Sequence, residues 1–89
     1  MPKEYLATLN ILVSDREVNA PEINDVITKF GHLIRARLGI HLGRKCVKNC
    51  SGLITLIVEG EKKELYKFAQ GFSKYKFAVV KLGFISEVK

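Results

Sequence analysis

Four stretches of the sequence have the hydrophobic pattern of β-strands. Residues 5–13 and 53–58 are apolar on both faces, as is typical of strands in the middle of a sheet. Residues 33–42 and 77–84 alternate instead, which predicts strands with one buried face. In the stretch 33–42 we expect the apolar face to pack on the helices and the charged face to meet solvent. That apolar face consists of Ile34, Ala36, Leu38, Ile40 and Leu42.

Two other stretches repeat apolar residues at the helical spacing of i, i+3, i+4 and i+7. The stripe of the first helix consists of Ile23, Val26, Ile27 and Phe30. Asn19 is the predicted N-cap of this helix, which places Pro21 in the first turn, where a missing N–H costs little. The second helix is predicted to begin near Lys62, with Glu64 in its first turn. Its stripe consists of Leu65, Phe68, Ala69 and Phe72.

The order strand, helix, strand, strand, helix, strand predicts an α+β fold, the ferredoxin-like βαββαβ sandwich. In this fold a four-stranded antiparallel sheet carries both helices on one face. The usual spatial order of its strands, 4-1-3-2, places the two strands that are apolar on both faces in the middle. The 89 residues fit one such domain, residues 1–89.

The sheet face away from the helices is predicted to be too apolar to remain in water. Leu53, Thr55 and Ile57 are expected on it, and the strand beside them has two alternatives. In the first alternative, this face is lined by Tyr5, Ala7, Leu9, Ile11 and Val13. In the second, it is lined by the residues that alternate with these five along the strand. In both cases we expect a homo-oligomer, a dimer or a tetramer, that covers the face.

Composition and charge exclude some classes of function. No apolar run reaches the roughly 20 residues that span a bilayer, and the first residues lack the apolar centre of a secretion signal. We therefore expect a cytoplasmic protein that does not associate with membranes. The formal net charge of +6 favours nucleic acid as a partner, but the basic residues are mostly dispersed, as on a solvated surface. Direct DNA binding is not expected.

The chain resembles the iron-only hydrogenase system regulators, and it is similar to the C-terminal half of nickel-responsive regulators and to ACT domains. The resemblance extends over residues 9–81, and its most specific part is Arg37-Leu38-Gly39-Ile40 followed by Gly52-Leu53-Ile54. It implies a ferredoxin-like fold and a protein partner in hydrogenase maturation or transcription. Nickel-responsive regulators place a ribbon-helix-helix DNA reader before this domain, whereas this sequence starts at the first strand.

Three potential metal ligands lie within ten residues: His41, Cys46 and Cys50. Thiolate and imidazole groups bind transition metals such as zinc or nickel, and the resemblance implies a metal site near this strand. The C-x3-C spacing is looser than that of a zinc knuckle, so a fourth ligand would come from His32, a carboxylate or another subunit. A redox-active cysteine pair and two packing cysteines are the alternatives.

Arg35 and Arg37 lie two residues apart on the charged face of the predicted strand 33–42. Two guanidinium groups side by side bind an anionic ligand, a carboxylate or a phosphate. The alternative is a solvated face whose arginines pair with glutamates of another strand or subunit.

The sequence contains no phosphate-binding glycine loop, dinucleotide-binding turn or nucleophile elbow, so we do not expect an enzyme. The preferred hypothesis is a regulatory or sensing module that oligomerises through its sheet and binds a small effector or metal at a subunit interface. One alternative is a ligand-free adaptor for protein–protein interaction, and another is a basic nucleic-acid-binding domain.

Overall fold

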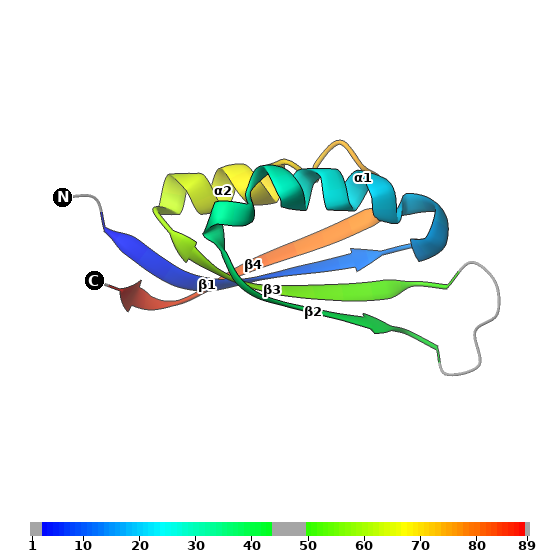
Figure 1. Cartoon of the computed structure of the whole chain (residues 1–89), viewed down its shortest axis with the longest axis horizontal. Coiled ribbons are helices and arrows are strands. Elements are labelled where there is room, and N and C mark those ends of the chain that lie inside the picture. The colour runs from blue at the N-terminus through cyan, green and yellow to red at the C-terminus, as the bar shows by residue number, and fades with distance from the viewer. Residues whose placement is uncertain (1–2, 44–49, 89) are drawn as a thin grey trace.

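The elements of the computed structural model, which describes residues 3–43 and 50–88, follow the predicted order. They are β1 (Glu4–Val13), α1 (Arg16–Lys29), the 3-10 turn η1 (Gly31–Leu33), β2 (Ile34–His41), β3 (Gly52–Gly60), α2 (Lys62–Gln70) and β4 (Ala78–Val88). All strand pairs are antiparallel, in the spatial order β2-β3-β1-β4. Both helices cover one face of the sheet and leave the other face open (Figure 1). The predicted ferredoxin-like βαββαβ fold is therefore confirmed.

The hydrophobic core fills the space between the sheet and the two helices. From β1 it receives Ala7, Leu9, Ile11 and Val13, all at most 1% exposed. These residues face the helices, so their neighbours along β1 line the open face. The alternative that placed Tyr5 and every second residue up to Val13 on the open face is therefore wrong. The alternative that placed the intervening residues there is confirmed.

Phe68 is the centre of an aromatic cluster in this core. Its side chain is fully buried, and its ring stacks on that of Phe30, with 4.8 Å between centroids. The ring of Phe72 lies 5.7 Å away, but Phe72 follows the end of α2 at Gln70, so the predicted stripe extends one position beyond the helix. These contacts join the end of α1 to α2, as the two apolar stripes predict.

Helix α1 begins earlier than the sequence predicts. Its N-cap is Asp15, in the left-handed conformation with φ 46°, and the N–H groups of Val18 and Asn19 donate to the Asp15 carbonyl at 3.2 and 3.1 Å. Asn19 is therefore inside the helix rather than its N-cap, and so is Pro21. The prediction failed because a left-handed residue turns the chain into the helix directly after β1. Helix α2 begins at Lys62, as predicted.

The register of β2 shifts between Ile34 and Ala36. Ile34 lies opposite Val58, on the helix side, but Ala36 lies opposite Ile57, on the open face. The shift leaves Arg35 as an additional residue in β2. Because neighbouring side chains of a strand point to opposite faces, one additional residue reverses every later position. From Ala36 onward, the predicted faces of this strand are therefore wrong: Leu38 and Ile40 point to the open face, and Arg37 to the helix side.

None of the helices within residues 3–43 and 50–88 combines the length and apolar character that a membrane span needs.

We expect Phe68→Ala to lower the free energy of unfolding by about 3–5 kcal/mol, the usual cost of deleting a buried aromatic ring. Urea denaturation monitored by circular dichroism measures the loss. Tyr66→Ala is the control, because Tyr66 lies on the same helix with a side chain that is 51% exposed. Equal losses for the two variants would contradict the central place of Phe68 in the core.

Candidate functional site

The open face of the sheet carries a continuous apolar row that crosses all four strands. Leu53 of β3 lies opposite Ile40 of β2 on one side and opposite Leu12 of β1 on the other. Leu12 in turn lies opposite Val79 of β4. Leu38 of β2 lies two positions from Ile40, in the next row of the sheet and opposite Thr55, and is 64% exposed. We call these five residues the open-face patch.

Polar groups border the open-face patch along the next row of the sheet. The Thr55 hydroxyl donates to the side-chain oxygen of Asn10 at 2.8 Å, so these two polar groups satisfy each other. Lys81 lies opposite Asn10 and is the charged residue of this row. This polar row separates the open-face patch from Ile57, an apolar residue of β3 that is 40% exposed further along the same face.

The helix side of β2 has a different character, because the register shift turns Arg37 towards α1. Between α1 and the sheet lies a small pocket of about 90 Å³. Its lining consists of Val13, Arg16, Ala20, Asn24, Arg37, Gly39, Gly52 and Ile54. We call it the arginine pocket, since Arg16 and Arg37 supply its charged groups.

Arg16 is held at the arginine pocket by its backbone and by its side chain. Its N–H donates to the carbonyl of Cys50 at 2.8 Å. Its side chain lies against Gly52, where an added Cβ would come within 3.2 Å of the Arg16 Nε. Its Nη1 donates to Nε2 of His41 at 2.8 Å. Because arginine only donates, Nε2 of His41 is the acceptor in this contact.

Arg37 is held from the other side of the same pocket. Its Nη2 donates to the side-chain oxygen of Asn24 on α1 at 2.8 Å. Arg35, in contrast, forms an ion pair with Glu59 of β3, with Nε and Oε1 3.0 Å apart. The two arginines that the sequence places side by side therefore bond to different elements, because the register shift separates them. Sequence reasoning missed Arg16, which lies outside the alternating strand and has no pattern that links it to Arg37.

The predicted metal ligands are only partly described. Cys46 lies outside the described residues, and Cys50 is disulfide-bonded, so that a thiolate at Cys50 requires reduction. Nε2 of His41 accepts a hydrogen bond from Arg16, and Nε2 of His32 lies 3.7 Å from Oε2 of Glu64. Within residues 3–43 and 50–88, no three or more His, Cys, Asp or Glu side chains gather in an arrangement suited to a metal ion. A zinc or nickel site at His41, Cys46 and Cys50 stays a prediction.

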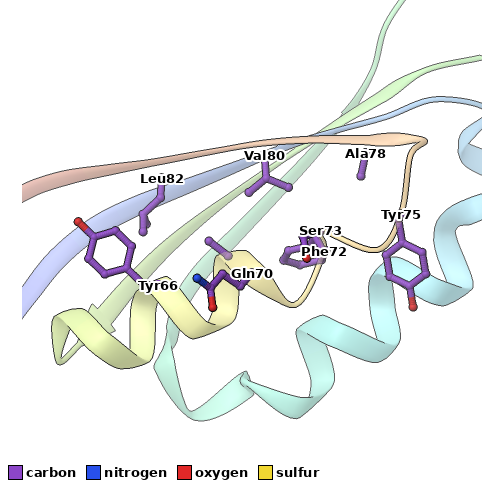
Figure 2. Close-up of a pocket in the computed structure, with 9 residues that line it drawn as sticks. Tyr66, Gln70, Phe72, Ser73, Tyr75, Ala78, Val80 and Leu82 are labelled. Atoms are coloured by element: carbon purple, nitrogen blue, oxygen red, sulfur yellow. The ribbon is translucent and has the colours of Figure 1, made fainter.

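A larger groove of about 390 Å³ lies between α2 and the edge strand β4. Figure 2 shows Tyr66 beside Leu82 at one end of this groove and Tyr75 near Ala78 at the other, with Phe72 between them. None of its lining residues is charged. The groove therefore offers apolar surface and a few hydrogen-bonding groups, in contrast to the arginine pocket.

We expect Gly52→Ala to break the contact between Arg16 and His41, because the new methyl group overlaps the Arg16 side chain. The 15N chemical shifts of the His41 ring report the loss. Gly39→Ala is the matched control in the same pocket, since a Cβ there meets no heavy atom within 4 Å. It should leave the His41 shifts unchanged. It should also raise the free energy of unfolding by up to about 1 kcal/mol, because alanine has less conformational entropy than glycine in the unfolded chain. Unchanged His41 shifts in Gly52→Ala would contradict the described packing.

Comparison with solved structures supports the fold. An uncharacterized protein from Thermotoga maritima is 20% identical, with a TM-score of 0.79 over 93% of this chain and 99% of that chain. CPII from Thiomonas intermedia, bound to ADP, AMP and acetate, is 14% identical, with a TM-score of 0.61 over 98% of this chain and 92% of that one. A protein from Thermus thermophilus described as "a putative PII-like signaling protein" is 12% identical, with a TM-score of 0.63 over 97% of this chain and 94% of that one. At such identities these likenesses show the fold alone.

A search of curated proteins gives no match. The family model that matches the chain, over residues 5–89, is the TM1266-like one, with the description "Iron-only hydrogenase system regulator, putative". The match covers both helices and all four strands. The chain therefore belongs to the TM1266-like family of iron-only hydrogenase system regulators.

Proposed function

We propose that this protein is a non-catalytic regulatory module that self-associates through the open-face patch. The observation that carries the proposal is the apolar row from Ile40 to Val79, which crosses the whole sheet on a face that no described helix covers. Membership of a regulator family supports the regulatory part of the proposal.

The exposure of the patch favours an interface. Leu38, Ile40 and Val79 are each 44% or more exposed, and Leu12 is 37% exposed. Single exposed apolar side chains are normal, but a contiguous set of them marks an interaction surface. Covering this set removes apolar area from water at about 25 cal/mol per Å², the usual driving force of association.

A second copy of the chain suits this patch better than a charged partner. With a net charge of +6, two copies repel each other through most of their surface. The apolar row carries no charged side chain, so two copies meet there with the least repulsion. A twofold contact also places the same row against itself, which makes apolar surfaces self-complementary.

The PII-like neighbours support a role for small ligands in this module. One is described as "a putative PII-like signaling protein", and another is bound to ADP, AMP and acetate. By this analogy of fold, we propose that ligand binding changes how the assembly interacts with a protein partner in hydrogenase maturation or transcription. The alternative is a ligand-free adaptor, in which the open-face patch docks directly on such a partner.

Val79→Glu tests the proposal, because a carboxylate enclosed by an apolar interface loses its hydration without gaining a partner. We expect the wild-type protein to be a dimer or larger oligomer and the variant to dissociate at least about 100-fold more readily. Sedimentation equilibrium over a range of protein concentrations measures both.

Val18→Glu is the matched control, since Val18 is 67% exposed on α1, on the other side of the sheet. It should leave the oligomer intact. A folded wild-type protein that stays monomeric throughout would contradict self-association and favour the adaptor. Equal dissociation of both variants would show that the open-face patch is not the interface.

A further inference from the structure

We infer that the arginine pocket binds a small oxyanion, a phosphoryl or carboxylate group, between the guanidinium groups of Arg16 and Arg37. The inference goes beyond self-association, and it rests on the proposed function only in that the oxyanion would be the effector. Neither family membership nor the structural neighbours assign these residues a role.

The charge at the pocket has no counterpart among the described residues. Arg16 and Arg37 come from different elements, α1 and β2, and both line the same pocket. Within residues 3–43 and 50–88, neither has a carboxylate within ion-pair distance, whereas Arg35 has Glu59 at 3.0 Å. Two guanidinium groups on one pocket repel each other, and an anion between them removes the repulsion.

Both guanidinium groups are positioned before any ligand arrives. Arg16 is fixed by Gly52 and His41, and Arg37 by Asn24. Each guanidinium has five N–H donors, and each of these contacts uses one nitrogen. Donors therefore remain for a ligand, and their positioning lowers the entropy that binding must overcome.

The pocket has the size and lining of a site for a few atoms. Its volume of about 90 Å³ admits a group such as phosphate or a carboxylate but not a whole nucleotide. Gly39 leaves open space above β2, because no heavy atom lies within 4 Å of where its Cβ would be. Val13 and Ile54 supply apolar walls, which strengthen the attraction between an anion and the arginines.

The same geometry disfavours a cation. The Nε2 atom of His41 accepts a hydrogen bond from Arg16, so a metal ion at this nitrogen would have to displace a guanidinium group. It would also lie beside a permanent positive charge. An anion meets neither obstacle.

Titration with inorganic phosphate at constant ionic strength tests the inference, with amide chemical shifts of 15N-labelled protein as the readout. We expect saturable shifts in residues around Arg16, Arg37 and Gly39. Arg37→Gln should weaken binding by about 10-fold or more, since it removes a charge-assisted hydrogen bond. Arg35→Gln is the matched control on the same strand, and it should change the affinity by less than about twofold, as for an exposed charge outside the site.

Gly39→Val is a second variant that keeps both arginines. Its side chain enters the open space of the pocket, and valine is favoured in strands, so it should fold and yet block phosphate. Equal effects of Arg35→Gln and Arg37→Gln would overturn the inference, because they indicate diffuse attraction by net charge. So would phosphate binding that Gly39→Val leaves intact.

A parallel titration with AMP and ADP distinguishes the two sources of the oxyanion. Shifts of the same residues by phosphate alone indicate a free anion, whereas shifts only with a nucleotide indicate its phosphoryl group. In both cases Arg37→Gln should weaken binding by about 10-fold or more. No saturable shift with phosphate, acetate or nucleotide would overturn the inference. The same titration of Val79→Glu separates the two proposals, because binding that persists in a monomer supports the site even where self-association fails.

Discussion

The register shift in β2 is the constraint on which both candidate surfaces depend. A single additional residue, Arg35, lies between Ile34, which faces the helices, and Ala36, which faces away from them. Because the side-chain period of a strand is two, this one residue decides the direction of all that follow. It sends Leu38 and Ile40 to the open face and Arg37 to the helix side. Without the shift, the apolar row would end at Leu53, and the arginine pocket would lack one of its two charges.

The two surfaces lie at the same end of the sheet and back to back. Gly39 lines the arginine pocket, while its neighbours Leu38 and Ile40 belong to the open-face patch. A ligand bound at the proposed site would therefore contact the same strand whose other side belongs to the proposed interface. Under the two proposals, this juxtaposition would give a short physical route from ligand binding to self-association, with the edge strand β2 as the shared element.

The topology could be predicted from the sequence because it depends on features with strong periodicity. The apolar runs of β1 and β3 and the two helical stripes fix the order and the place of the core. The start of α1 could not be predicted from the sequence, because it depends on the left-handed conformation of Asp15 rather than on an N-cap at Asn19. The faces of β2 were predicted wrongly because a register shift leaves the alternation of residue types intact. Of the predicted anion-binding arginines, Arg37 lines a pocket, whereas Arg16 takes the place expected for Arg35 and comes from another element.

The most direct test of this account is the pairing of β2 with β3 in solution, measured by cross-strand nuclear Overhauser effects between backbone protons. The account predicts that Ala36 contacts Ile57 and Arg37 contacts Leu56, although Ile34 contacts Val58. Contacts of Arg35 with Ile57 and of Ala36 with Leu56 would show an unshifted register. That result would return Leu38 and Ile40 to the helix side and remove both the open-face patch and the arginine pocket.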